Sequence, residues 1–319
     1  MSLRTKGDLY GCTIRREEQY GKFNSAGTSV YAGTADSVSN DDSVEYQDNP
    51  SETGLMPDGV TYTMHSYGFT LNARMTWTTL EEWLKLTLGD DLDFTPDMTS
   101  FSARFNVSPN ESKLYLGCKV TNLTVKADGL GRLLMVTAKV LAKYATYNEA
   151  TSTNLFKDPN GVQISFPSVD KPDGVPLHYC RNPYKAVPVS SYVPVPAKSW
   201  TLSFDRGLTR EPGMIGSTTS CKVSASGIDS VPQPAKSTLV MTQAQSSIAW
   251  DKIKLEGQET ESPDDVTGCI VVPIGTGPQQ EVSIAKYHIE GGLTANSQTT
   301  YDETIAIVIT SITEKTEGA

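Results

Sequence analysis

Residues 114–144 read LYLGCKVTNLTVKADGLGRLLMVTAKVLAKY and predict one long β-hairpin. Apolar and polar residues alternate with a period of two along both halves, which is typical of strands with one buried face and one face in water. The polar positions are Thr124, Lys126, Asp128, Thr137 and Lys139. Between the halves lies DGLG, whose glycines can adopt the positive φ of a tight connection. Each strand is expected to run for about ten residues, which is long for a small domain.

The composition describes a globular, acidic chain. It has 319 residues, of which 38% are hydrophobic and 20% charged, and its formal net charge is −10. This length suffices for roughly one to three domains with their own cores. A surface with net negative charge repels the phosphates of nucleic acids, so tight direct binding of DNA or RNA is disfavoured.

Cysteine usage and the N-terminal sequence bear on the cellular compartment. The five cysteines are odd in number, widely spaced and without a C-x-x-C pair. We therefore expect reduced, mostly buried thiols, with one adventitious disulfide as the alternative. They are Cys12, Cys118, Cys180, Cys221 and Cys269. The opening MSLRTKGDLYGC lacks the apolar segment of a signal peptide, and no apolar run approaches membrane-spanning length, so we expect synthesis in the cytoplasm.

The first sixty residues are polar. They are rich in Ser, Thr, Asn, Asp and Gly and include the acidic run SNDDSVEYQDNPSE (residues 39–52), which favours an arm followed by a long loop, either solvated or ordered only by a partner. Alternation in FTLNARM, residues 69–75, then predicts a strand.

A helix is predicted directly after this strand. Two pairs of residues have capping-box spacing at its start, Thr78 with Glu81 and Thr79 with Glu82. The apolar stripe that follows consists of Leu80, Trp83, Leu84 and Leu88. Gly89 is expected to end the helix as its C-terminal cap.

The character of the chain changes at residues 167–196, which hold seven of the 18 prolines. Such a segment tends to run extended and to avoid central strands, so it predicts a connection between two units. Beyond it, STLVMTQAQSSIAWDKIKLEG (237–257) aligns without a gap on FTLNARMTWTTLEEWLKLTLG (69–89). The same offset places Ala138 on Ala306 and carries the hairpin onto SIAKYHIEGGLTA and YDETIAIVITSI. The shared order of strand, helix, strand and long hairpin indicates an internal duplication.

Recognisable catalytic or metal-binding chemistry is sparse. The three histidines, His65, His178 and His288, form no Ser/His/Asp or HExxH pattern, and there is no P-loop or GxGxxG sequence. The segment GDDLDFTPD (89–97) could offer oxygen ligands to calcium, but it lacks EF-hand spacing, so we interpret it as a solvated acidic loop. The sequence therefore predicts neither an enzyme nor a bound metal or cofactor.

Several sequence segments, and the order in which they occur, resemble those of the major tail tube proteins of long-tailed, non-contractile (siphovirus-type) phages and related archaeal viruses. LYLGCKVTNLTVKADGLGRLLMVTAKVLAK is similar to that family's glycine–cysteine or glycine–valine entry into a strand, with its turn and a return strand ending in a small residue and lysine. AKSWTLSFDRGLTREPGMIGS resembles its Ser–aromatic–x–Leu–Ser strand, and KSTLVMTQ and YDETIAIVITSI resemble the strands that follow. The likeness covers most of residues 62–312. It departs from the family in the acidic loop 37–54 and in the length of the proline-rich connection.

The resemblance implies a mainly β fold with two tandem tail-tube-like β-barrel or β-sandwich units. Each unit would carry a long β-hairpin and one short flanking α-helix. Residues 1–165 would hold an N-terminal arm, the acidic loop and the first unit, residues 166–198 the proline-rich connection, and residues 199–319 the second unit. Long hairpins with open edges are an aggregation hazard unless paired, and closing a barrel across subunits removes those edges.

The function implied by the resemblance is that of a structural virion protein. Made in the host cytoplasm and located in the virion tail, it would form stacked rings whose lumen conducts viral DNA without specific binding. Two units per chain favour a trimeric, pseudo-sixfold ring, with a hexamer as the alternative, and a barrel well beyond roughly 16–18 strands keeps an aqueous lumen. The expected partners are other copies of the chain and the tail-tip or initiator, tape-measure and tail-terminator proteins, without a membrane.

The polar faces of the hairpins supply the candidate lumen residues. They are Thr124, Lys126, Asp128, Thr137, Lys139, Glu290, Asp302 and Thr304. Acidic side chains on the wall would repel DNA within a Debye length of about 8 Å. The two lysines among the candidates weaken a uniformly negative lumen.

A binding protein is the competing hypothesis. A two-domain β-sandwich surface adhesin or carbohydrate-binding protein would present aromatic side chains on a flat face. Tyrosines near the proline-rich connection are candidates for that role: Tyr144, Tyr147, Tyr179, Tyr184 and Tyr192.

Overall fold

The computed structural model describes residues 11–49, 59–90, 92, 98–108, 111–148, 155–187, 191–208, 236–244, 269–277, 280–296 and 302–313. Within them lie the helix α1 (Trp77–Leu88) and seventeen strands. The strands are β1 (Gly11–Arg16), β2 (Ser29–Asn40), β3 (Ser43–Asn49), β4 (Gly59–Arg74), β5 (Phe101–Ser108), β6 (Glu111–Ala127), β7 (Met135–Ala142), β8 (Tyr144–Tyr147), β9 (Leu155–Lys157), β10 (Gln163–Ser165), β11 (Tyr184–Val187), β12 (Ser191–Pro194), β13 (Ala197–Asp205), β14 (Ser237–Ala244), β15 (Cys269–Pro273), β16 (Glu281–Asn296) and β17 (Asp302–Thr313). The mainly β fold predicted from the sequence is confirmed.

The hairpin predicted over residues 114–144 is present, with strands of unequal length. β6 and β7 pair antiparallel, with Leu123 opposite Ala138. Gly131 in the turn has a φ of +79°, which glycine adopts without steric cost. β6 has 17 residues and β7 has 8, because the first part of β6 pairs with β5 and β8 instead of β7.

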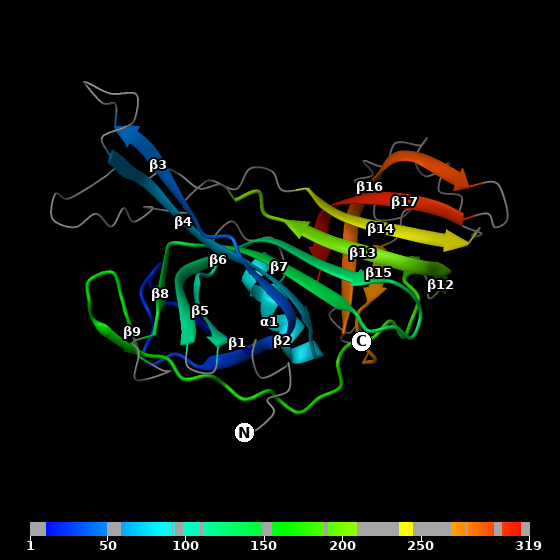
Figure 1. Cartoon of the computed structure of the whole chain (residues 1–319). Helices are drawn as coiled ribbons and strands as arrows, with labels where there is room; N and C mark the ends of the chain where they lie inside the picture. The colour runs from blue at the N-terminus through cyan, green and yellow to red at the C-terminus, as the bar shows by residue number, and fades with distance from the viewer. Residues whose placement is uncertain are drawn as a thin grey trace.

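Six strands of the first half close into a barrel. The pairings run β1–β2, β2–β4, β4–β7, β7–β6, β6–β5 and β5–β1. The helix α1 packs against β2 and β6, among the strands of the barrel (Figure 1). Its predicted apolar residues Leu80, Trp83 and Leu84 are buried in the core. The indole Nε1–H of Trp83 donates a hydrogen bond of 2.9 Å to the carbonyl oxygen of Ala32, which fixes the helix to β2.

The helix ends where the sequence predicts but begins differently. Gly89 is the C-terminal cap, with a φ of +108° and its N–H bonded to the Lys85 carbonyl. The N-cap is Thr76, which makes no side-chain capping hydrogen bond, so both proposed capping boxes are wrong. Their glutamates Glu81 and Glu82 instead form ion pairs with other side chains.

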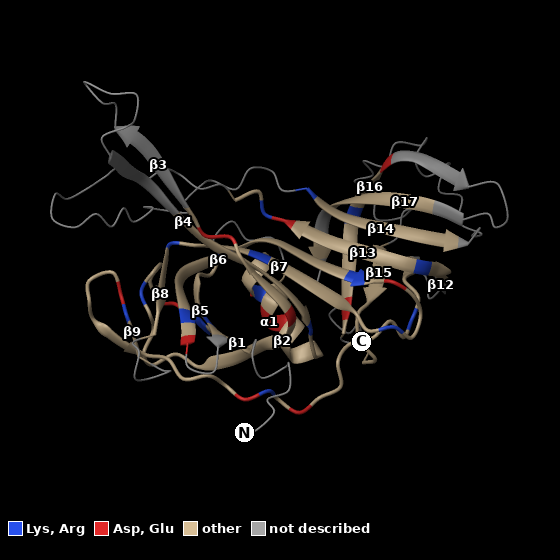
Figure 2. Cartoon of the chain, in the orientation of Figure 1, with Lys and Arg blue, Asp and Glu red and all other residues tan. Residues whose placement is uncertain are grey.

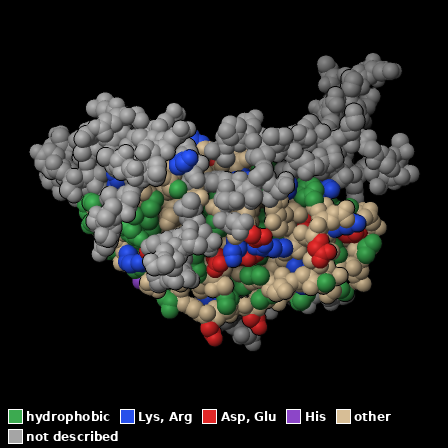
Figure 3. Space-filling model, turned by 180° about the vertical axis from the view of Figure 1, so that it is seen from behind, with side chains coloured by type: hydrophobic (Ala, Val, Ile, Leu, Met, Phe, Trp, Pro, Cys, Tyr) green, Lys and Arg blue, Asp and Glu red, His purple; other side chains and the backbone are tan. Residues whose placement is uncertain are grey.

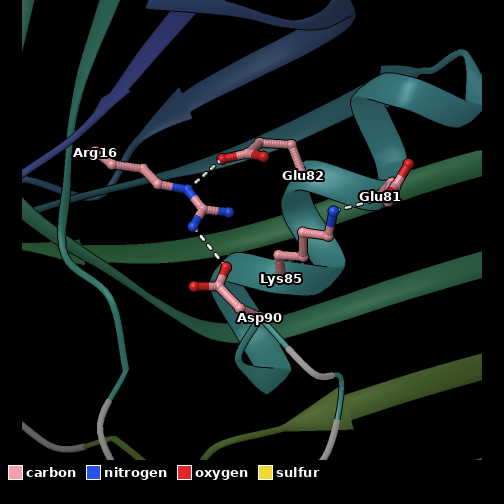
Figure 4. Close-up of polar contacts among 5 residues, drawn as sticks. All are labelled: Arg16, Glu81, Glu82, Lys85 and Asp90. Atoms are coloured by element: carbon pink, nitrogen blue, oxygen red, sulfur yellow. Dashed lines mark hydrogen bonds and ion pairs between the residues drawn. The ribbon is translucent and has the colours of Figure 1, made fainter. Parts of the chain in front are cut away.

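Arg16 connects β1 to α1 (Figure 4). Its Nε lies 2.6 Å from Oε1 of Glu82, and its Nη1 lies 2.6 Å from Oδ1 of Asp90 just beyond the helix. On the helix itself, Lys85 Nζ lies 2.7 Å from Glu81 Oε1. The Arg16 contacts therefore join two elements far apart in the sequence, whereas the Lys85 pair is local.

Replacing Arg16 by alanine is expected to lower the free energy of unfolding by about 0.5–1 kcal/mol, since half-exposed ion pairs contribute little individually. The matched control is Lys85→Ala, which removes only an i,i+4 pair and should cost about 0.3–0.5 kcal/mol. Urea denaturation of both variants measures the difference. An equal or smaller loss for Arg16→Ala would show that this residue does not help to hold α1.

The prediction of a solvated arm and loop over the first sixty residues is wrong for the part that the structure describes. β1, β2 and β3 form there, and the described part of the acidic run passes from the end of β2 into β3, both of which pair with β4. Asp42 in this run pairs with Lys113 Nζ and accepts a hydrogen bond from the Gly68 N–H. These partners are distant in the sequence, and their contacts fix the conformation of the acidic stretch. The composition of the stretch could not reveal such contacts. Residues 1–10 and 50–58 lie outside the described ranges.

The second half repeats the pairings of the first. β15 pairs with β16, β16 with β17 and β17 with β14, as β5, β6, β7 and β4 do in the first half. β15 begins at Cys269 and β5 at Phe101, an offset of 168 residues (269 − 101) that equals the offset of the sequence alignment. The topology therefore supports the duplication. The helix expected at 245–257 lies outside the described residues.

The gap-free alignment is wrong by one residue at β17. Leu71 lies opposite Ala138, but its counterpart Leu239 lies opposite Ile307 instead of Ala306. A slip of one residue moves every side chain to the other face of a sheet. Ala306 and Ala138 therefore point to opposite faces.

Two short strands complete the second set of pairings. β11 pairs with β15 and β12, while β13 pairs with β14. Only Val195 and Pro196 separate β12 from β13. The strands β12 and β13 together therefore correspond to the single strand β2, which pairs with both β1 and β4. Proline has no N–H to donate to a ladder, which suits a break in the strand. β11 and β12 lie within residues 166–198, which the sequence analysis treated as connection alone.

The rest of this proline-rich segment packs against the hairpin turn. Leu177 and Tyr179 are buried. The Tyr179 carbonyl accepts a hydrogen bond of 2.7 Å from the Gly131 N–H, and the Tyr179 N–H donates one of 2.8 Å to the Arg132 carbonyl. The segment therefore fixes the turn in place.

The two halves are joined edge to edge. β13 pairs with β6, with Leu202 opposite Val125, and we call this pairing the internal joint. One cluster of buried side chains extends through both halves. As a result β2, β4, β7, β6, β13, β14, β17 and β16 lie side by side in one sheet, whose long strands cross the molecule in Figure 1.

Candidate functional site

One face of this eight-stranded sheet is lined mainly by polar side chains, with Met135, Val240, Ala306 and Val308 among them, and we call it the polar face. Cross-strand partners project to the same side of a sheet. One row of partners crosses five strands: Asn72, Thr137, Thr124, Ser203 and Thr238. The opposite side of the same strands carries the core, including Leu71, Leu123 and Leu202. The polar face is therefore continuous across the internal joint.

Hydrogen bonds connect the polar side chains across the strands. Thr137 Oγ1 donates to Asn72 Oδ1 at 2.7 Å, and Thr124 Oγ1 lies 3.0 Å from Ser203 Oγ. Asn122 Nδ2 also donates to Ser203 Oγ, at 3.2 Å. Uncharged groups that satisfy one another in this way form a surface that is wetted by water and keeps little net charge.

The sequence-predicted candidates fall mostly on this face. Those on β6 and β7 lie together, with Thr124 directly opposite Thr137, Lys139 opposite Asn122 and Lys126 opposite Met135. Asp128 follows β6 and contacts Lys126. The remaining candidates lie on the far side of the internal joint: Glu290 opposite Ala306, and Thr304 opposite Thr242. The Asp302 backbone belongs to β17, and its side chain lies outside the described residues.

Three basic groups on or beside the polar face have acidic partners, whereas Lys139 on the same face has none among the described residues. Lys126 Nζ lies 2.8 Å from Asp128 Oδ1, and Arg74 Nε lies 3.1 Å from Asp36 Oδ2. Lys236 pairs with Glu290, and this hydrogen bond lowers the pKa of the Glu290 carboxyl. In Figure 2 most of the length of β6, β7, β13 and β14 is tan, the colour of residues other than Lys, Arg, Asp and Glu. Seen from behind, the molecule also places acidic and basic side chains next to one another (Figure 3).

The sequence analysis missed several members of the polar face. Asn72, Asn122, Ser203 and Thr238 were not among the candidates, although each stands at a polar position of an alternating strand. The alternation was a usable signal for their orientation. What it could not supply was the order of the strands, which brings Thr124 within 3.0 Å of a side chain 79 positions away.

The tyrosines considered for an adhesin do not form one platform as far as their side chains are described. Tyr179 is buried, and its hydroxyl donates a hydrogen bond of 2.7 Å to the Ala197 carbonyl. Tyr144 packs against Tyr67, with ring centroids 6.1 Å apart, and Tyr147 on β8 is 49% exposed. The Tyr192 side chain lies outside the described residues.

The chemistry of the polar face is that of hydrogen bonding and electrostatics. His288 Nε2 lies 3.8 Å from Glu290 Oε1, and both side chains are about half exposed. In the described ranges no group of three or more His, Cys, Asp or Glu residues is arranged to hold a metal ion. Nor does any described helix have the length and apolar character needed to cross a membrane.

No family model matches the chain, and no curated protein matches its sequence.

Proposed function

We propose that this chain is a structural virion protein that assembles into stacked rings, which form the tail tube through which viral DNA passes. The sequence resemblance suggests this function, and the polar face is the structural observation that carries it. In the proposed tube this face lines the lumen. Other copies of the chain are the main partners, and tail-tip or initiator, tape-measure and tail-terminator proteins complete the tail.

The polar face has the properties that a DNA conduit requires. Proteins hold DNA mainly by neutralising phosphates with Lys and Arg, so a wall that is to release its cargo must offer few free cations. Here Lys126, Arg74 and Lys236 each have a carboxylate partner, and Lys139 is a cation of this face that has none among the described residues. The hydroxyl and amide groups between them are hydrogen-bonded to one another. Such a surface stays wet and binds phosphates weakly.

The strand count is compatible with an open tube. Each chain contributes eight strands to the sheet that carries the polar face. Three chains would therefore supply about 24 strands, well above the number at which barrels keep an aqueous lumen. Because each chain contains two similar sets of strands, the trimer would have pseudo-sixfold symmetry. A hexameric ring is the alternative.

Electron microscopy tests the proposal directly. Purified, untagged protein should form rings or hollow tubes of constant diameter in negative stain, with matching growth in light scattering. End-on views would distinguish three subunits from six. Protein that stays monomeric when concentrated and seeded with tail-tip complexes would refute the tail-tube function.

Removing the acidic partner of Lys126 should make the wall retain DNA. In Asp128→Asn the Lys126 ammonium loses the carboxylate 2.8 Å away, and many copies along a tube would each gain a free cation. We expect assembled tubes to retain several-fold more double-stranded DNA in co-sedimentation, with a steeper salt dependence. Asp170→Asn in the proline-rich segment is the matched control, because it changes net charge equally at an exposed site outside the strands that carry the polar face. Equal retention by the two variants would argue against this face as the lumen.

A further inference from the structure

The internal joint depends on two strand edges, one from each half of the chain. Over residues 122–127, β6 pairs with β7 along one edge and with β13 along the other. The first part of β6 is occupied differently, by β5 and β8. β13 in turn pairs with β14 on its second edge. Both edges of each of the two strands are therefore paired in the region of the internal joint.

The counterpart of this β6 edge is open in the second half. β16 takes the place of β6, and its residues 290 and 294–296 pair with β17 along one edge, with an irregularity in the register at residues 291–293. β15 pairs only with the beginning of β16, up to Ile284. Within the described part of the chain, no strand lies along the other edge of residues 290–296.

The counterpart of β13 is open in the first half. β2 pairs with β4 through residues 34–40, and β1 covers the other edge of β2 only from Ser29 to Thr34. Val38 lies opposite Leu71, as Leu202 lies opposite the aligned Leu239. Leu202 is fully buried because β6 covers it, whereas Val38 is only partly buried. Val38 therefore marks the position at which a covering strand is missing among the described residues.

We propose that the open edge of β16 in one chain pairs with the open edge of β2 in a second copy, which repeats the internal joint between chains. We infer that the partner at each open edge is a second copy of this chain, because the chain already makes the equivalent contact between its own two halves. Ile289 and Val38, both partly buried on the core side, would be covered as Leu202 is in the internal joint. The polar face would continue from β16 onto Ser37 and Ser39 of the next chain. This inference rests on the proposed self-assembly and specifies its contact surface.

The joint uses two different edges, so it is head-to-tail, and repeated addition gives a ring if the rotation closes. An ammonium placed on the core side of either edge should block pairing, as inward-pointing charges do at natural sheet edges. Val38→Lys blocks the β2 edge and Ile289→Lys blocks the β16 edge. We expect each variant alone to associate at least about 100-fold more weakly than the parent chain, since the charge would be buried without a partner.

Mixing the two variants provides the decisive observation. Val38→Lys retains an intact β16 edge and Ile289→Lys an intact β2 edge, so an equimolar mixture should form one joint and stop at a heterodimer in analytical ultracentrifugation. Val162→Lys is the control, because Val162 is already 60% exposed, and it should assemble like the parent chain. If the parent chain assembles and both edge variants assemble equally well, the joint lies elsewhere while the tail-tube function stands. If the parent chain never assembles, the function itself fails.

Hydrogen exchange extends the test to the case in which a lysine variant does not fold. In the unaltered chain, those backbone amides of residues 35–40 and 290–296 that point to the open edges should become protected at least about tenfold on assembly, because they enter a hydrogen-bonded ladder. Amides of β7, which are already paired on both sides, should change little. Assembly without protection at these two edges would overturn the proposed joint.

Discussion

Replacing Trp83 by alanine is expected to lower the free energy of unfolding by about 3–5 kcal/mol, the range for truncating a large aromatic side chain in a core. Trp83 is fully buried on α1 and contacts Phe101 edge-on, with ring centroids 5.8 Å apart. The substitution also removes the donor to the Ala32 carbonyl. Equilibrium denaturation in urea, followed by circular dichroism, measures the loss.

Trp83→Phe separates the two contributions to this loss. It keeps an aromatic ring but removes the indole N–H, so the cavity is smaller and the Ala32 carbonyl still lacks its partner. We expect it to cost roughly half as much as the alanine variant or less. Leu130→Ala is the matched surface control, since Leu130 is 66% exposed, and its effect should be within about 0.5 kcal/mol of zero. A small loss for Trp83→Ala would mean that α1 is not anchored through this side chain.

Glu17→Ala is expected to cost about 2–4 kcal/mol, because it leaves several buried donors without an acceptor. The Glu17 carboxylate accepts hydrogen bonds from the backbone N–H of Gly21 at 2.8 Å and of Gly117 at 2.9 Å. The hydroxyls of Ser100 and Ser102 donate to it at 2.9 and 2.7 Å. The same denaturation assay applies. A loss below about 1 kcal/mol would show that water or other groups replace the carboxylate.

Glu17 should also leave a signature in the pH dependence of stability. Burial raises the pKa of its carboxyl above the ordinary value of 4.5, and the four hydrogen bonds oppose this shift only in part. A group with a raised pKa in the folded state stabilises the fold at low pH and loses that contribution as the pH rises through the folded value. The advantage of the parent chain over Glu17→Gln, which does not titrate, should therefore shrink as the pH rises from 4.5. An advantage that grew with pH would mean that the donors hold the anion more strongly than burial opposes it.

Local pattern determined much of the fold. The alternation in residues 123–127 and 134–140 correctly separated the buried from the polar side of β6 and β7. Gly89 was predictable as a helix end because few other residues adopt its φ of +108°. The helix start was missed because Thr76, Thr78 and Thr79 are similar candidates, and the observed Thr76 makes no side-chain cap that a motif could reveal.

Contacts between distant segments could not be predicted from composition. The acidic run around Asp42 reads as solvated chain until Lys113 and Gly68 are brought to it from other strands. The same reason limits the candidate site. Alternation gave the orientation of Thr124 and Thr137, but the strand order decides that Ser203 lies beside them. The one-residue slip at β17 shows that the strand register decides which face of the sheet a side chain projects from. Sequence alignment cannot fix that register.

The internal joint has a consequence for how assembly depends on concentration. β6 and β13 belong to the same chain, so their pairing forms when the chain folds and does not weaken on dilution. In the proposed ring every second contact would be of this kind, which halves the number of encounters between molecules needed to close it. Growth would then proceed two repeats at a time, and a ring with an odd number of repeats could not form. The duplication within one covalent chain would thus restrict the ring to an even number of repeats.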